Sequence, residues 1–598
     1  MVGGKSKNSK KTTSADSDVL ATALKRFKQS WDYAEANWHN KWDRGIKLYD
    51  NERVHATYEG TTNTFVPMTF STIETMVAAL SNASPRFEYK PGNPMTQADD
   101  KALNALTDEW WDEDQWDLAI EEGERETLIT GMCGFMFSWD MDHPHLDSYA
   151  MRDMIVDPTI RNPYQLQQPG AYAGRRYFVR KGALDDMKVV DTDPESKTYQ
   201  EMIPRYKSSK DEPAGPQGDP DDKEVKEMFS GSTLASAKED QDEIIEIWDV
   251  DRVVTIRNRR QVIEDVVNPY KHKHQLQLLQ KYQEAGDEDA ELKAKSEAKG
   301  IVPFFFFRNY RKLSLFYATS EIESIAKSQE LLNDMTNMET DYIIKQLAPQ
   351  KELDPKYADW IDLITSDPDV VYPFEPGSLV DRQVPVLPNN SFNNRMNIKN
   401  EIRETTAIDQ VAKGVQNVKQ TTATEVQAQL NQSGQRIQSK ARILEKDGFY
   451  WMAWILMKMI QLYVTEPMVV EIPGGSPMTP EEALDKYGIE LPKGTGVFDP
   501  ADFAEDFKVR VTLDVDSQNT KIENQESISR AYQILIQDPT NNLEEIKRRL
   551  LPKMVDIDQA DLDAIMTPNP NQQLPGMAGG EVDPAALGAV APEVPGGF

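Results

Sequence analysis

The sequence predicts an α+β protein with more helix than strand. Two unusually long stretches carry apolar residues at helical spacing, residues 320–347 and residues 423–464. Between residues 134 and 267 the pattern changes to short apolar runs, punctuated by Asp-Pro and Asn-Pro, which is typical of strands. A proline-rich stretch, residues 349–390, lies between the long helices and predicts a small α/β excursion.

The composition excludes several classes of protein. The chain has 598 residues, of which 39% are hydrophobic, and this is enough apolar surface for several cores. With 67 Lys+Arg against 99 Asp+Glu the net charge is −32, which argues against a high-affinity, sequence-specific DNA binder. A single cysteine, Cys133, excludes a disulfide framework and a cysteine-based zinc site, so we expect a reducing compartment.

No segment is expected to cross a membrane. The most apolar run, residues 449–464, has 16 residues and is interrupted by Lys458 and Gln461, whereas a bilayer span needs about 20. It is better explained as a buried helix. Residues 1–18 contain lysine, serine and threonine without an apolar core, so we expect a disordered basic arm and not a secretory signal.

The first half of the chain is expected to alternate between helices and strands. Helices are predicted at 19–50, 96–131 and 275–299, and a short strand leading into a helix at 65–80. An acidic, Pro/Gly-bearing surface insertion is expected at 205–241. The predicted strands are 135–140, 154–156, 176–179, 243–250, 252–256 and 262–267.

The second half begins with a dense aromatic strand, Phe304–Tyr310. A helix of about 42 Å follows at 320–347, and its apolar stripe consists of Ile322, Ile325, Leu332, Met335 and Met338. Helix resumes at about 393–411, and a loop containing Gly414 leads into the long helix at 423–464. We expect strands at 468–472 and 507–515, helix at 517–565, and a disordered Pro/Gly tail at 567–598.

The sequence gives little support for catalysis. It lacks the glycine-rich phosphate loops of nucleotide-binding proteins and the G-x-S-x-G and H-E-x-x-H signatures. We therefore predict no catalytic residues, no cofactor and no metal site. Two histidine groups remain open as ligands, but we favour a polar hairpin turn for the first and a solvated loop for the second: residues 140–147 (Asp140, Asp142, His143, His145, Asp147) and His272 with His274.

The loop between the helix at 393–411 and the long helix at 423–464 contains two lysines and several side-chain amides. Its candidate DNA-facing residues are Lys413, Gln416, Asn417, Lys419 and Gln420. An ordinary inter-helix turn explains the pattern slightly better than a mobile loop that touches phosphates weakly and without sequence preference.

The order of these elements resembles that of the portal proteins of tailed bacteriophages. The residues that carry the resemblance are Pro303–Tyr310 with Leu315–Ser324, Thr421–Val426, and Asp153–Pro158. The first pair is similar to the segment that leads into the family's first stem helix. The second segment is similar to the start of the family's long helix after its tunnel loop, and the third to part of its wing. The resemblance covers residues 60–565. Ala318 departs from it, because family members often have glycine there.

The resemblance implies a ring, usually of twelve copies, at one vertex of a capsid. It implies N-terminal helices at 19–60, followed by named regions: wing 61–315, first stem helix 316–347, clip 348–390, second stem helix 391–411, tunnel loop 412–422, long helix and return wing strands 423–515, and helical crown 516–566. The apolar stripe of the 320–347 helix is then expected to pack against neighbouring copies, because a narrow stripe cannot bury itself alone.

The resemblance also implies the partners. Double-stranded DNA would pass through the channel during packaging and ejection, and the clip would meet the large subunit of terminase and then the head–tail adaptor. Major capsid and scaffolding proteins would be further partners of a virion component that is assembled in the host cytoplasm. Two alternatives stay open, another collar or adaptor ring protein and a metal-dependent nuclease that uses residues 140–147.

Overall fold

A computed structural model describes the fold, and most of what it describes lies before residue 471. It describes residues 14–54, 61–81, 85–91, 100–140, 143–180, 188–190, 202–204, 241–287, 289–364, 371–383, 390–406, 436–471, 483–484, 486, 488, 491, 495–500 and 507–513. Helices and several small antiparallel sheets occur together, as the α+β prediction requires. The predictions at 1–13, 205–240, 407–435 and 514–598 fall outside the described residues.

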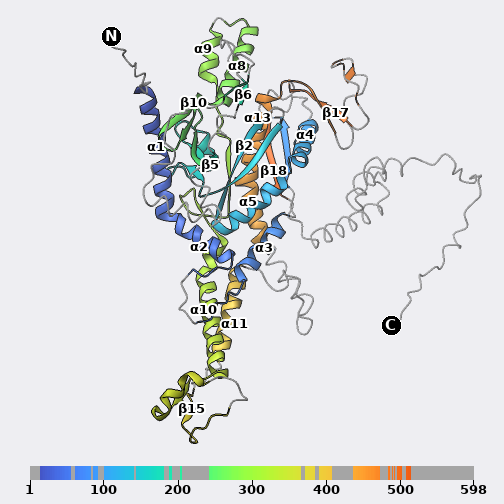
Figure 1. Cartoon of the computed structure of the whole chain (residues 1–598). Helices are drawn as coiled ribbons and strands as arrows, with labels where there is room; N and C mark the ends of the chain where they lie inside the picture. The colour runs from blue at the N-terminus through green and yellow to red at the C-terminus, as the bar shows by residue number, and fades with distance from the viewer. Residues whose placement is uncertain are drawn as a thin grey trace, which may run out of the picture. The chain divides into compact units, whose positions relative to one another are not determined.

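The N-terminal helices pack across a five-stranded sheet. Helix α1 (Ser14–Ala34) continues through a π-helical turn (Glu35–His39) into α2 (Asn40–Tyr49), as predicted for 19–50. Ala23 and Phe27 of α1 are buried against Ile245 and Ile247 of the sheet. Figure 1 shows α1 lying alongside this sheet. The sheet has the order β10 (Gln261–Val267), β9 (Arg252–Arg257), β8 (Gln241–Trp248), β5 (Ala173–Arg180), β4 (Met154–Val156).

The main core surrounds a three-stranded sheet, in the order β11 (Phe304–Arg308), β2 (Met132–Asp140), β3 (His143–Ala150). All four phenylalanines of β11 are buried, and Phe305 stacks on Phe135 with ring centroids 4.9 Å apart. Helix α13 (Tyr450–Tyr463) also contributes to this core, so the apolar run at 449–464 is a buried helix as predicted. Within the described residues, no helix combines the length and apolarity needed to cross a bilayer.

The remaining strands form two-stranded sheets. Two of them pair distant parts of the chain, β1 (Pro85–Pro91) with β18 (Phe507–Leu513), and β16 (Met468–Glu471) with β17 (Thr495–Phe498). The others are short, β6 (Lys188–Val190) with β7 (Met202–Pro204), β12 (Tyr310–Arg311) with β13 (Ala318–Thr319), and β14 (Lys351–Leu353) with β15 (Leu379–Asp381). A 3-10 helix, Pro355–Leu363, lies between β14 and β15, and another, Pro163–Gln167, lies between β4 and β5.

Several predicted elements differ from the structure. Two single helices are each a pair, α4 (Asp100–Glu113) with α5 (Trp116–Thr130), and α8 (Pro269–Glu284) with α9 (Ala290–Glu297). The breaks coincide with backbone in the left-handed region, at Gln115 (φ 51°) and Gly286 (φ 72°). The strand predicted before helix α3 (Met68–Ser81) is absent, because residues 61–67 pair with side chains instead. The long helix predicted at 423–464 is described from residue 436 onward, and it contains a π-helical turn, Glu445–Phe449.

Candidate functional site: the α10–α11 helix pair and its buried polar contacts

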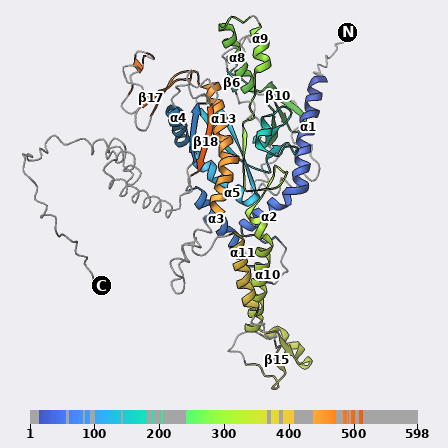
Figure 2. The ribbon, with the colours of Figure 1, turned by 180° about the vertical axis from the view of Figure 1, so that it is seen from behind.

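Helix α10 (Glu321–Leu347) begins within Leu315–Ser324, one of the segments that carry the resemblance described above. The hydroxyl of Ser320 caps it by accepting a hydrogen bond from the amide of Glu323 at 2.9 Å. Glu321 and Glu323 place negative charge at the positive end of the helix dipole. Its partner is α11 (Asn390–Thr406), which lies beside it in both views of the ribbon (Figures 1 and 2).

The apolar stripe predicted on α10 is largely covered within one chain. Ile325 and Leu332 are buried against Ile398 and Ile402 of α11, with Met335 at the edge of this cluster. Ile322 is buried in the main core, whereas Met338 has 69% of its surface exposed. The expectation that the whole stripe waits for neighbouring copies is therefore wrong for its inner residues, because α11 and the segment around Val66 cover them. A role of Met338 between copies stays a prediction.

A different set of apolar side chains on the same pair is exposed. On α10 it lies mainly toward the C-terminal end, and one residue of α11 joins it: Leu331, Met338, Ile343, Ile344, Leu347 and Met396. Exposed apolar side chains at this density on two paired helices are typical of surfaces that another protein covers.

Side chains of α10 hold an extended segment of backbone along one face. Gln329, Asn333, Asn337 and Asp341 recur every fourth residue, so they line up along the helix. Their partners are every second residue of the segment Thr62–Val66. Asn337 accepts from the amide of Thr64 at 2.8 Å and donates to its carbonyl at 3.0 Å. We call this set of contacts the amide ladder.

The amide ladder continues in both directions from Asn337. Toward the N-terminus of α10, Val66 donates its amide to Asn333 at 3.0 Å and accepts from Gln329 at 2.7 Å. Toward the C-terminus, Asp341 accepts from the amide of Thr62 at 2.8 Å. The spacing matches because four helical residues rise about 6 Å and two extended residues about 6.6 Å.

Ion pairs fasten α10 to the N-terminal helices on a second face. Arg44 of α2 binds Glu330 through two hydrogen bonds of 2.8 and 2.7 Å. Lys41 lies 3.2 Å from Glu323, and Arg53 pairs with Asp334. The bidentate pair of Arg44 fixes both position and orientation of the helix. Sequence inspection missed these contacts, although the i, i+7 spacing of Glu323 and Glu330 was visible.

The first turn of α10 is also bound by a buried lysine. Lys440 donates to Asn309 at 2.6 Å and forms an ion pair with Glu321. Burial lowers the pKa of Lys440, while the carboxylate of Glu321 opposes that effect. One helical turn earlier, Arg436 donates to the carbonyl oxygen of Thr405 in the last turn of α11. Two cations on one helix thus contact the adjoining ends of both α10 and α11.

A second buried ion pair lies further along the same helix. Arg308, at the end of β11, donates to Asp447 at 2.6 Å and also to the carbonyl of Phe316 at 3.1 Å. Asp447 belongs to the π-helical turn, where Gly448 packs so closely on Phe307 that an added Cβ would lie 2.3 Å from the ring. The turn is therefore held by a charge and by close packing.

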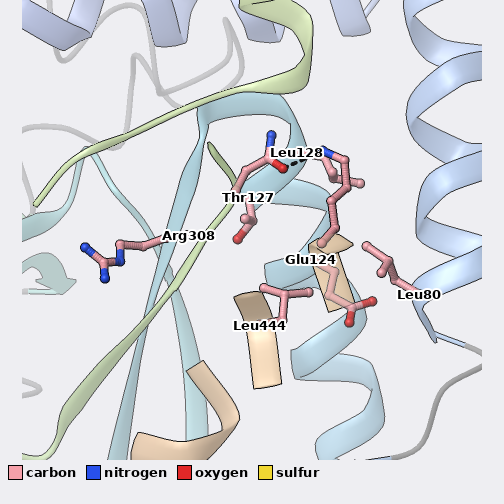
Figure 3. Close-up of a pocket in the computed structure, with 8 residues that line it drawn as sticks. Leu80, Glu124, Thr127, Leu128, Arg308 and Leu444 are labelled. Carbon is pink, nitrogen blue, oxygen red and sulfur yellow. Dashed lines mark hydrogen bonds between the residues drawn. The ribbon is translucent and has the colours of Figure 1, made fainter. Parts of the chain in front are cut away.

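A cavity of about 10 Å³ lies beside these contacts, with room for about one water molecule. Figure 3 shows it between α3, α5 and the helix that carries Leu444, with the guanidinium of Arg308 pointing away from Glu124. Burial raises the pKa of Glu124 to about 8, and its hydrogen bond from Ser81 opposes that rise. This cavity is too small for a substrate, so it supports no enzymatic role.

The other residues singled out from the sequence are placed as follows. Lys413, Gln416, Asn417, Lys419 and Gln420 lie outside the described residues. His143 and His145 lie on strand β3, where Asp140 pairs with His143, so most of 140–147 is strand and not the polar turn that we favoured. His145 contacts Asp114 at 2.9 Å and Asp147 at 3.4 Å. The described residues contain no group of three ligands suited to a metal ion.

The second histidine pair lies on a helix and not in the loop we favoured. His272 and His274 belong to α8, and His274 accepts a hydrogen bond from the amide of Lys299 at 3.1 Å. Burial lowers the pKa of His274, the hydrogen bond with the backbone of Lys299 opposes this effect, and the charges of Lys458 and Lys299 lower the pKa further. A neutral imidazole that accepts from the backbone holds α8 against the chain after α9 and has no evident chemical task.

Residues 279–521 match the family described as "Phage SU10 portal protein". The match spans less than half of the chain and includes α10, α11, the π-helical turn and α13. It confirms the resemblance to tailed-phage portal proteins predicted from the sequence. None of the curated proteins matches the chain.

Proposed function

We propose that the chain is the portal protein of a tailed bacteriophage and assembles into a ring, of twelve copies, around an axial channel for DNA. The observation that carries this proposal is the match over residues 279–521, because that stretch contains the complete α10–α11 pair. In this proposal, α10 and α11 form the stem and residues 348–390 form the clip. Residues 61–315 together with 423–515 form the wing, and residues 516–566 form the crown.

Contact between copies is supported by the apolar side chains that one chain leaves uncovered. Leu331 and Met338 are two helical turns apart, so they lie on one face of α10. Covering such a face with the stem of the next copy buries apolar surface that a monomer exposes to water. A ring supplies that cover at every copy, because each interface is the same.

The channel is proposed to hold DNA weakly. Twelve chains with a net charge of −32 each repel the phosphate backbone, which favours sliding over binding. Lys413 and Lys419 of the proposed tunnel loop, residues 412–422, would give brief phosphate contacts without sequence preference. Terminase and then a head–tail adaptor are proposed to dock at the clip during packaging and after it.

The experiment compares two pairs of charge reversals in particles assembled with the phage's own capsid and terminase proteins. Lys413→Glu with Lys419→Glu should lower the amount of DNA packaged or retained per particle. The matched control, Lys281→Glu with Lys295→Glu, changes the charge equally on exposed residues of α8 and α9. Equal packaging and retention in both would remove the loop from the proposal.

A collar or adaptor ring protein remains the alternative, and a metal-dependent nuclease is the less favoured one. Within that cluster, His145 contacts Asp114 and Asp147. A nuclease assay with divalent metal ions, on the wild type and on Asp142→Ala, tests the remaining possibility. Activity that disappears with this substitution would restore it.

A further inference from the structure

We propose that Arg436 and Lys440 form a two-point clamp that makes the adjoining ends of α10 and α11 move together with the helix containing residues 436–463. The inference concerns one chain, so it holds whether or not copies assemble into a ring. It rests on three sets of contacts that lie on one helix.

The first point of the clamp is Arg436. Its guanidinium donates to the carbonyl oxygens of Thr405 and Glu404, the latter at 3.4 Å. Arg436 therefore binds backbone carbonyl groups at the end of the described part of α11 from a different helix.

The second point is Lys440, one turn further on and on the same face. Its ammonium group is almost fully buried, lies 3.9 Å from the centre of the Tyr310 ring, and contacts both Asn309 and Glu321. Glu321 is the first residue of α10 and is itself buried. Breaking this contact would leave two buried charges unpaired, so the helix and the start of α10 stay together.

The far end of the clamp helix is anchored in the main core. Asp447 binds Arg308, and the ring of Phe449 lies 4.8 Å from that of Phe307. Residues 436–444 are helical and extend from this anchor over about 13 Å. A displacement at residue 436 therefore acts on α11 through Arg436 and on α10 through Lys440, with the π-helical turn as the fixed end.

Hydrogen exchange on the full-length protein tests the clamp. The variant is Lys440→Met with Glu321→Gln, because removing both charges avoids the penalty of an unpaired buried ion. The matched control is Arg442→Met with Glu466→Gln, which removes one positive and one negative charge from exposed positions on and after the same helix. Thermal unfolding establishes first that both variants are folded.

The clamp predicts that amide exchange rises at least tenfold in the first turn of α10 and also in the last turn of α11, although α11 carries no substitution. The control should leave both turns unchanged. A rise confined to α10, or none at all, would overturn the proposal. If Lys440→Met with Glu321→Gln does not fold, Arg436→Met replaces it, and increased exchange must then reach the first turn of α10.

Discussion

The side chain of Asn337 binds both backbone groups of Thr64, accepting from its amide at 2.8 Å and donating to its carbonyl at 3.0 Å. A side-chain amide has the same donor and acceptor as a peptide group, so α10 pairs with an extended segment as a neighbouring strand would. The contact joins residues 273 positions apart and explains why residues 61–67 form no sheet.

Asn337→Leu should lower the free energy of unfolding by about 1–2 kcal/mol, because the two backbone groups of Thr64 lose their partners. Chemical denaturation measures the change, and exchange of the Thr64 amide should become faster. Asn397→Leu is the matched control, since Asn397 is exposed on α11. A similar loss in both variants would show that the amide ladder contributes nothing specific.

Asp447→Asn should lower the free energy of unfolding far more than the loss of an exposed charge does. The guanidinium of Arg308 is buried, so removing its counter-ion leaves a cation without compensation, at a cost of about 3–5 kcal/mol. Glu466→Gln removes one negative charge from an exposed position after α13 and should change stability little. Adding Arg308→Met to Asp447→Asn should recover much of the loss in denaturation experiments, and no recovery would contradict the argument.

Glu124 should make stability depend on pH. Its pKa is raised from 4.5 to about 8 in the folded chain, so between these values the folded state keeps a proton that the unfolded state releases. The contribution of Glu124 to the free energy of unfolding is therefore fully present below pH 4.5. It decreases by about 1.4 kcal/mol per pH unit until about pH 8.

Glu124→Gln should remove this dependence, because a glutamine side chain does not titrate. The stability advantage of the variant over the wild type should grow from pH 5 to pH 8 and then level off. Glu113→Gln, an exposed position on α4, should show a constant difference in the same denaturation series. A constant difference for Glu124→Gln as well would contradict a raised pKa.

Local patterns predicted most of the described elements. The apolar spacing of 320–347 and the consecutive phenylalanines at 304–307 correspond to α10 and β11. The breaks within 96–131 and 275–299 were missed, since the first depends on a left-handed residue, Gln115, with no glycine to indicate it. The second has Gly286 in its sequence, a signal that was overlooked.

The polar contacts of the candidate site could not be predicted in the same way. The four-residue spacing of Gln329, Asn333 and Asn337 shows that they share a face, but not that a segment more than 260 residues away lies on it. Likewise the partners of Lys440 are 131 and 119 positions away in the chain. Contacts of this kind depend on the tertiary fold, and sequence periodicity carries no record of them.

Electron microscopy of the purified protein, combined with its mass in solution, tests the central proposal most directly. We expect annular particles with an axial hole and a mass corresponding to about twelve chains, because a neighbouring copy is needed to cover Leu331 and Met338. A compact monomer that persists at high concentration would contradict it.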